Sequence, residues 1–176
     1  PTGRLIKLKD PEAKVVFIGP CAAKKLEASR KSVRSDIDFV LTFEEMMGVF
    51  EAKNIDLEAM EEEKEVSEAS RDGRNFAIAG GVAEAVVNCI KKMYPDQEIK
   101  VESAQGLREC KKLMTLAKAG KYNGYLLEGM ACPGGCVAGA GTLQAINKST
   151  MAVKQYATSA DYQYCCDTDY LKDLEE

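Results

Sequence analysis

Short apolar segments alternate with helix-like segments along most of this chain of 176 residues. Short runs of β-branched and aromatic residues, bounded by Gly, Pro or polar residues, predict strands. Such runs lie at residues 13–20, 37–43, 75–81, 98–104 and 122–130. Strands that alternate with helices indicate an α/β fold, in which helices flank a mostly parallel β-sheet. The length fits one domain with a hydrophobic core of its own.

The segments between these strands carry helix signals. Thr42 and Glu45 form a capping box, which predicts a helix that continues through Phe50. Apolar residues at helical spacing predict two further helices. One stripe runs through Val82, Val86, Ile90 and Met93, and the other through Leu107, Cys110, Met114 and Ala117.

Two segments have a more polar character. Residues 51–75 are rich in acidic side chains, which is typical of a solvated helix or a mobile loop. A helix is expected from about Leu143, and the chain then ends in a polar, acidic stretch. We therefore predict an α/β subdomain over residues 1–145, followed by a C-terminal helix and polar tail over residues 146–176.

The charge and hydropathy of the chain argue against two classes of partner. The formal net charge is −4, whereas a nucleic-acid-binding surface is usually basic. No apolar run approaches the roughly 20 residues that a membrane-spanning helix needs. Residues 1–10 lack the apolar core of a signal peptide. We predict a cytoplasmic protein that binds neither nucleic acid nor membrane.

The chain contains seven cysteines and no histidine. Without histidine, a transition metal would have to be held by thiolates, carboxylates or the backbone. An odd number of cysteines, with no secretory signal before them, does not suit a disulfide framework. The cysteines therefore point to metal binding or redox chemistry.

Four of the cysteines have a simple structural interpretation. Cys89 lies beside a predicted apolar stripe and Cys110 lies in one, so both are expected to be packed core thiols. Cys165 and Cys166 stand next to each other in the acidic C-terminal stretch and are expected to be exposed thiols of the tail. None of these four is predicted to bind a metal.

The other three cysteines follow predicted strands. Cys21 comes after the first strand, and Cys132 and Cys136 come after the fifth. In a parallel sheet the carboxyl ends of the strands meet at one edge, where ligands gather. We therefore expect these three thiols to converge at the same end of one sheet.

The stretch EGMACPGGCVAG, residues 128–139, surrounds two of these thiols with small residues. Gly134 and Gly135 would let backbone amides approach a bulky group, as in an iron–sulfur cluster held by thiolates. A structural zinc site and a glycine-rich turn with incidental cysteines remain alternatives. Lys24, three residues after Cys21, could reach an anionic ligand of such a centre or could be a solvated surface residue.

Two stretches resemble signature motifs of the iron–iron hydrogenases. FIGPCAAKKLEA is similar to the second motif, Pro-Cys-x-x-Lys-x-x-Glu, and LEGMACPGGCVAGAG to the third, Glu-x-Met-x-Cys-x-x-Gly-Cys. The resemblance covers about residues 4–145, which would be about half of an iron-only hydrogenase cluster domain. The matched residues are Pro20, Cys21, Lys24, Glu27, Glu128, Met130, Cys132, Gly135 and Cys136.

The resemblance implies an H-cluster, which is a 4Fe–4S cluster joined to a diiron subcluster. By position, Cys21, Cys132 and Cys136 would be metal ligands, with Cys136 as the bridge to the diiron unit. Lys24 would donate to a cyanide ligand and Met130 would pack near the diiron site. The implied reaction is reversible reduction of protons to H2, with electrons from a ferredoxin-like donor and cluster insertion by hydrogenase maturation proteins.

The chain also departs from the family pattern. The first motif, a Thr-Ser-Cys-Cys-Pro-type stretch that supplies the fourth cluster cysteine, is absent. Gly19 stands where methionine is usual, and residues 139–142 read GAGT instead of Gly-Gly-Gly-Gln. These departures resemble the divergent branches of the family, which include hydrogen-sensing members. We expect a C-terminal fragment that needs the N-terminal remainder of its parent and is inactive alone.

Two alternative functions remain open on the sequence. One is a non-catalytic iron–sulfur scaffold or assembly protein related to the hydrogenases. The other is a plain binding module whose thiols hold zinc or nothing. If an active-site face is missing, self-association through exposed apolar surface is also expected.

Overall fold

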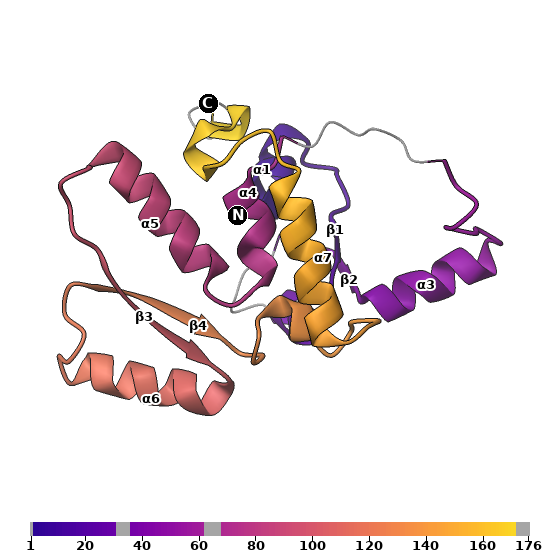
Figure 1. Cartoon of the computed structure of the whole chain (residues 1–176). Coiled ribbons are helices and arrows are strands. Elements are labelled where there is room, and N and C mark those ends of the chain that lie inside the picture. Colours follow the sequence, from indigo (N-terminus) through magenta and orange to yellow (C-terminus); the bar gives the residue numbers. More distant parts are fainter. Residues whose placement is uncertain (1, 31–35, 62–67, 172–176) are drawn as a thin grey trace. The chain divides into compact units, whose positions relative to one another are not determined.

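The computed structural model describes residues 2–30, 36–61 and 68–171 (Figure 1). The chain forms two compact units, unit 1 with Pro1–Glu63 and Gly139–Gln144, and unit 2 with Lys64–Ala138 and Ala145–Glu176. Each unit contains a two-stranded parallel sheet with helices beside it, which confirms the predicted α/β class. The predicted division into residues 1–145 and 146–176 stays a prediction.

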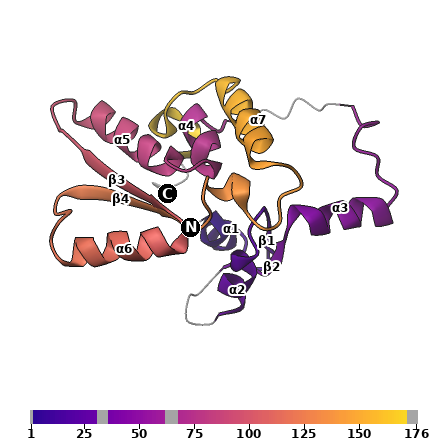
Figure 2. The same cartoon turned by 60° about the horizontal axis from the view of Figure 1, so that its bottom comes forward.

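Unit 1 is built around strands β1 (Val16–Ile18) and β2 (Phe39–Leu41). They pair in parallel, with Val16 opposite Phe39. Helix α1 (Thr2–Lys9) precedes β1, α2 (Ala23–Ser29) follows it, and α3 (Phe43–Ala52) follows β2. Helix α2 packs beside β2 (Figure 2). Both strands lie within the segments in which the sequence predicts them.

The predicted capping box is present at the start of α3. The Glu45 amide donates to the Thr42 hydroxyl at 3.2 Å, and the Thr42 amide donates to the Glu45 carboxylate at 2.8 Å. Lys25 of α2 reaches both carboxylate oxygens of Glu45 at 2.7 Å. The hydrogen bond from Lys25, followed by that from the Thr42 amide, holds the pKa of Glu45 below its ordinary value of 4.5.

This lowered pKa predicts an acid-sensitive helix α3. A depressed carboxyl pKa adds stability at neutral pH, and this contribution is lost as the pH falls from about 4.5 through the folded-state value. In Glu45→Gln, the loss of stability caused by protonation of Glu45 should disappear from the acid transition. Helix α3 should also be less stable in this variant at neutral pH. Circular dichroism during acid titration of both proteins tests this. An unchanged acid transition in Glu45→Gln would contradict it.

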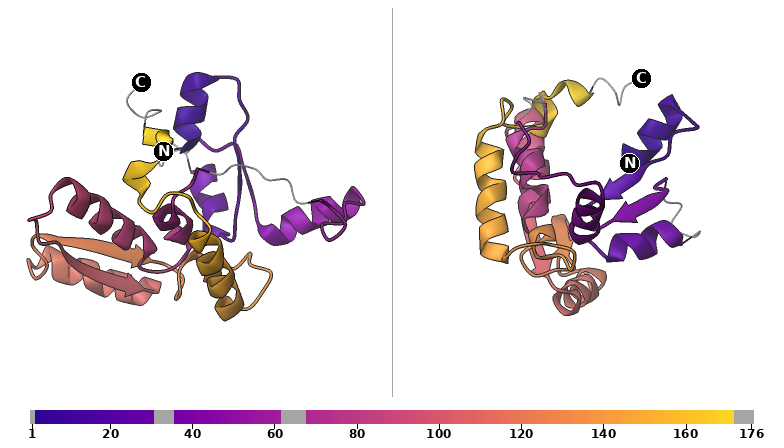
Figure 3. Two further views of the ribbon diagram at one scale, coloured as in Figure 1. Left: turned by 45° about the horizontal axis from the view of Figure 1, so that its top comes forward. Right: turned by 90° about the vertical axis from the view of Figure 1, so that its right-hand side faces the viewer.

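Unit 2 contains strands β3 (Lys100–Gln105) and β4 (Tyr125–Met130), which pair in parallel over their whole length. Helices α5 (Gly81–Met93) and α6 (Leu107–Lys118) lie on opposite faces of this pair (Figures 1 and 2; Figure 3, left). Helix α7 (Ile146–Thr158) packs against the short helix α4 (Arg71–Arg74). The 3-10 turns of this unit are η2 (Asn75–Ala77), η3 (Cys136–Ala138), η4 (Cys165–Asp167) and η5 (Asp169–Leu171).

The predicted helices form, but their apolar stripes are only partly buried. Leu113 is the buried residue of α6, whereas Leu107 and Met114 are 75% and 70% exposed. In α5 the buried positions are Gly81, Ala83 and Ala85. The buried positions of α5 are therefore small residues, and several large apolar side chains remain uncovered in the described part of the chain.

The strand predicted at residues 75–81 is wrong. Ser70 caps α4 by accepting from the Gly73 amide at 3.0 Å, and the chain continues into η2. The Ala79 amide then donates to the Gly134 carbonyl at 3.0 Å instead of to a neighbouring strand. The segment therefore contacts a loop of unit 2 through its backbone.

The structure describes part of the acidic segment at residues 51–75. Its residues 62–67 lie outside the described residues, and residues 53–61 form exposed turns after α3. In the three described ranges, no helix combines the length and apolar character that crossing a membrane requires.

Candidate metal centre

The loop after β4 carries two of the predicted ligands. Cys132 is half-buried and Cys136 is exposed, at the start of η3. The Gly135 amide donates to the Cys132 carbonyl at 3.0 Å, and the Ala138 amide donates to the Gly135 carbonyl at 3.1 Å. These bonds fold the residues between the two cysteines into a tight turn, so both thiols belong to one rigid feature.

Glycine is required at the centre of this turn. Gly134 and Gly135 both have φ of +96°, a conformation that L side chains rarely adopt. A Cβ on Gly135 would lie 2.5 Å from the Ala79 nitrogen and 2.7 Å from the Ala77 oxygen. The turn is therefore pressed against the backbone of η2 and the residues after it.

Gln105 holds the other side of the turn. Its side-chain oxygen, at the end of β3, accepts from the Gly134 amide at 2.8 Å. The Gly134 carbonyl accepts from the Ala79 amide at 3.0 Å. Sequence reasoning missed Gln105, although its place at the end of a strand next to β4 is the signal that could have found it.

Glu128 supports the loop from inside the unit. Its carboxylate is buried and accepts from the Gly80 amide at 2.6 Å and from the Ala83 amide at 3.0 Å. Helix α5 begins after Gly80, which has no side chain to cap it. A carboxylate from β4 therefore caps the N-terminus of α5 and complements its dipole.

Cys21 lies in unit 1, where it follows β1 after Gly19 and Pro20 and is half-buried. The Gly141 amide donates to the Pro20 carbonyl at 3.0 Å. A Cβ on Gly141 would meet Thr42 at 2.6 Å, so the backbone there has room only for glycine. The segment just after the Cys132–Cys136 loop thus belongs to unit 1 and is held beside the residue that precedes Cys21.

The other two predicted site residues have well-defined partners. The Lys24 ammonium lies 2.5 Å from the Glu27 carboxylate, and both side chains are a little under half exposed. Met130 is half-buried at the end of β4, where its carbonyl accepts from the Gly106 amide at 2.8 Å. Lys24 lies in unit 1, and Met130 is the last residue of β4 in unit 2.

The three predicted ligands do not lie on one sheet. Cys21 follows the sheet of unit 1, whereas Cys132 and Cys136 follow the sheet of unit 2, so the expectation of a single sheet is wrong. Among the described residues, no group of three Cys, Asp or Glu side chains is arranged to hold a metal ion. The donor set of the loop still fits iron, because two soft thiolates flank glycines that place no side chain between them.

The remaining cysteines differ from expectation in one respect. Cys110 is half-buried, and its sulfur lies 3.6 Å from the carbonyls of Ala104 and Met130, as a core thiol would. Cys89 is half-buried too. Cys165 and Cys166 are also half-buried, so the prediction of exposed tail thiols is wrong. The C-terminal turn packs against α4 and α5 instead of extending into solvent.

Comparisons with known proteins agree with these motifs. Residues 1–140 match the family model of the iron only hydrogenase large subunit, C-terminal domain. The chain is 28% identical to the periplasmic iron hydrogenase large subunit of Nitratidesulfovibrio vulgaris, over 82% of its own length and 44% of that protein. It is also 28% identical to cytosolic iron-sulfur assembly component 3 of Pongo abelii, over 80% of its own length and 38% of that protein.

The fold is also similar to that of solved hydrogenases. The structure of an FeFe-hydrogenase from Chlamydomonas reinhardtii superimposes with a TM-score of 0.66 at 19% identity. The match covers 98% of this chain and 61% of the solved chain. The chain spans less than half the length of the two curated relatives and about 60% of the solved hydrogenase.

Proposed function

The chain belongs to the family of the iron only hydrogenase large subunit, C-terminal domain, and from this premise we propose that it supplies part of the ligand set of a hydrogenase-type cluster. The observation that carries this proposal is the glycine turn between Cys132 and Cys136. It is fixed by hydrogen bonds from both sides and leaves its two thiols at least partly accessible.

We propose that Cys21, Cys132 and Cys136 bind the iron of an H-cluster, with Cys136 as the bridge between its 4Fe–4S and diiron parts. When bound, this group supplies the electron and hydrogen chemistry. The chain's own contribution is to hold the thiolates in place. Gly134 and Gly135 keep the space between two of them free of side chains.

Lys24 and Met130 have supporting roles in this proposal. The Lys24 ammonium would attract an anionic ligand of the iron, and Glu27 orients it through the 2.5 Å ion pair. Met130 would provide an apolar wall near the diiron unit. It is well placed for this because it directly precedes the cysteine turn and is half-buried.

We propose that the activity of the whole protein involves polypeptide beyond this chain. Three cysteines leave a four-cysteine iron–sulfur cluster one ligand short, and many large apolar side chains are exposed in the described residues. We propose that an N-terminal remainder covers part of this surface and supplies the missing ligand. A ferredoxin-like donor and hydrogenase maturation proteins would be further partners, and the isolated chain would self-associate.

An iron–sulfur assembly role is the second candidate. It is supported by the equal identity of the chain to a hydrogenase and to an assembly component. Both roles use the same cysteine turn. They differ in whether the longer protein accepts a diiron unit and then evolves or senses H2.

Anaerobic reconstitution with iron and sulfide tests the proposed ligands. We expect the chain to bind both, and Cys132→Ser and Cys136→Ser to lower the bound iron several-fold. Cys110→Ser is the matched control and should bind iron like the original chain, because this thiol packs against the backbone of β3 and β4. Iron and acid-labile sulfide analysis provide the readout.

Two results would overturn parts of this proposal. Stoichiometric zinc with no iron after reconstitution would favour the plain binding module. Hydrogen evolution by the isolated chain at the rate of a complete hydrogenase would contradict the requirement for further polypeptide. If the longer protein binds iron and sulfide but evolves no H2 after treatment with the maturation proteins, and does not respond to H2, the assembly role is favoured.

A further inference from the structure

Two cysteines that the proposed cluster does not use lie together in unit 2. Cys89 is in the C-terminal half of α5, and Cys166 is in the turn η4 near the C-terminus. Both are half-buried free thiols. Cys89 lies close enough to Cys166 to raise the pKa of its thiol, and η4 packs against α5, although the two residues are far apart in the sequence. The C-terminal segment therefore returns to α5 and places a second thiol beside the first.

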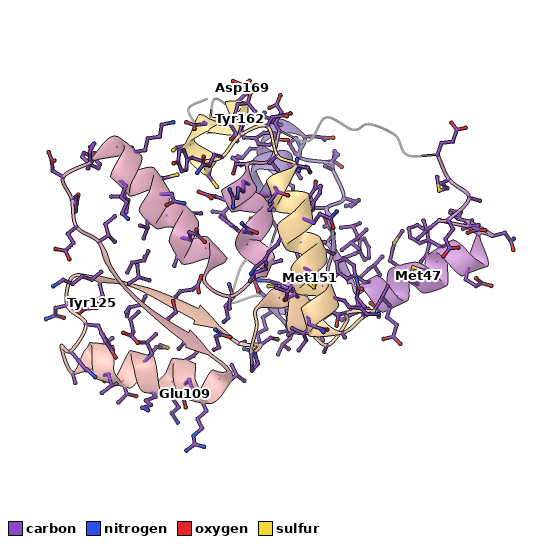
Figure 4. The ribbon with its side chains drawn as sticks, in the orientation of Figure 1. Met47, Glu109, Tyr125, Met151, Tyr162 and Asp169 are labelled. Carbon is purple, nitrogen blue, oxygen red and sulfur yellow. The ribbon has the colours of Figure 1, made fainter. Side chains whose placement is uncertain are left out.

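This juxtaposition is held by contacts on both sides. The Arg71 amide donates to the Tyr162 carbonyl at 2.8 Å, and the Asp72 amide donates to the Gln163 carbonyl at 3.1 Å. These bonds pin the start of the C-terminal segment to α4. Figure 4 shows Tyr162 and Asp169 on the turns at this end of the chain.

Contacts next to the two thiols fix the turn on α5. Lys92, one helical turn after Cys89, forms an ion pair with Asp167, the residue after Cys166. Its ammonium also lies 5.4 Å from the centre of the Tyr164 ring. Both the helix and the turn are therefore anchored within one residue or one helical turn of the thiol pair.

We propose that Cys89 and Cys166 are a redox-active dithiol that closes to a disulfide and latches the C-terminal turn onto α5. Neighbouring thiols on two packed elements can reach the S–S bond length of about 2.05 Å by a local movement of the turn. The bond would join two segments that are distant in sequence, and so would restrict local opening of the C-terminal turn. The ligand class of this site is a small-molecule disulfide.

The reaction is an ordinary thiol–disulfide exchange. The Cys89 thiolate attacks one sulfur of the small disulfide, the S–S bond of that reagent breaks, and one small thiolate leaves. The Cys166 thiol loses its proton to solvent and attacks the Cys89 sulfur, which releases the second small thiolate. Two electrons pass from the protein to the reagent, and the two protons lost by the protein end on the two small thiols.

The surroundings of Cys166 disfavour it as the attacking group. Burial raises the pKa of the Cys166 thiol, the adjacent Cys89 raises it too, and the Asp167 carboxylate adds to this, whereas the Lys92 ammonium lowers it. Cys166 therefore forms less thiolate than an ordinary thiol and acts in the second, intramolecular step. There its closeness to Cys89 compensates for its small thiolate fraction.

Cys165 is a matched control, although it is the immediate neighbour of Cys166. The Ser70 hydroxyl lies 3.2 Å from its sulfur, and the carbon that a side chain on Gly73 would add lies 3.7 Å from it. Cys165 therefore points to α4, whereas Cys166 points to α5. Oxidation should therefore link Cys89 to Cys166 and not to Cys165.

The test is oxidation of the purified full chain with oxidised glutathione, followed by alkylation and peptide mapping. We expect one pair of peptides joined between Cys89 and Cys166. The mass of this pair should be about 2 Da below the summed mass of the two reduced peptides. The Cys165→Ser variant should form the same link. The Cys89→Ser and Cys166→Ser variants should both lose it, and Cys166→Ser should carry a glutathione on Cys89. Protection of the C-terminal turn from proteolysis should rise several-fold only where the link forms.

Several results would overturn the dithiol. They are a link between Cys165 and Cys166, a link that survives in Cys89→Ser, or seven alkylated cysteines after oxidation. None of them bears on the iron-binding test, because Cys89 and Cys166 are not proposed ligands of the cluster. A chain that binds no iron but forms this link would support the latch and reject the cluster.

Discussion

Replacement of Gly135 by alanine is expected to destabilise unit 2 by about 3 kcal/mol or more. The φ of +96° strains any L side chain, at a cost of about 1–2 kcal/mol. The added Cβ would also press against the backbone of Ala77 and Ala79 at 2.7 and 2.5 Å, and overpacking of this kind costs about 1–3 kcal/mol, sometimes more. Backbone cannot move aside as a flexible side chain can. Urea denaturation followed by circular dichroism measures the loss.

Gly124→Ala separates the two parts of this effect. Gly124 also has a positive φ, +79°, but no atom lies within 4 Å of the carbon that alanine would add. This control should lose only the conformational part, about 1–2 kcal/mol. The alkylation rate of Cys132 should rise in Gly135→Ala and stay unchanged in Gly124→Ala. Equal destabilisation by the two substitutions would show that the turn is not pressed against η2.

Local signals in the sequence predict much of unit 1 and the loop of unit 2. The runs that become β1, β2, β3 and β4 are recognisable from their β-branched and aromatic residues, and the box of Thr42 and Glu45 marks the start of α3. These signals are reliable because each depends on residues close together in the chain. The cysteine turn is predictable for the same reason, since its glycines and thiols are contiguous.

Features that depend on distant contacts are not predictable in this way. Residues 75–81 look like a strand because they are apolar, but the Ala79 amide bonds to Gly134 and the amides of Ile78 and Gly81 bond within the segment, not to a sheet. Cys165 and Cys166 look exposed because their neighbours are polar, yet Lys92 and Ser70 hold their turn on α5 and α4. In both cases the deciding partner is far away in the sequence.

The division of the strands between two sheets also depends on contacts between residues far apart in the sequence. A strand–helix alternation indicates parallel pairing, which the structure confirms, but it does not say which strands pair. The chain divides its strands between two units, and Cys21 therefore follows a different sheet from Cys132. The motif resemblance identifies the ligands without assigning them to a common sheet.

Replacement of Glu128 by glutamine should show how strongly the loop depends on the helix behind it. The buried carboxylate accepts two amide hydrogens at the N-terminus of α5, at 2.6 and 3.0 Å. A glutamine keeps the shape, but it loses the charge and directs an N–H group at one of these donors. We expect a loss of about 1–3 kcal/mol in the free energy of unfolding. Amide hydrogen exchange at Gly80 and Ala83 should also accelerate.

Glu109→Gln is the same chemical change at the surface of α6, where the carboxylate lies 3.8 Å from Lys112 (Figure 4). An exposed pair of this kind is worth about 0–1 kcal/mol, so this control should be close to neutral. Glu128 lies on the strand that leads into the cysteine turn, so weakening its bonds to α5 should also loosen Cys132 and raise its alkylation rate. If Glu128→Gln lowers stability but leaves that rate unchanged, the carboxylate caps the helix without positioning the thiols. If neither changes, the cap is not a significant source of stability.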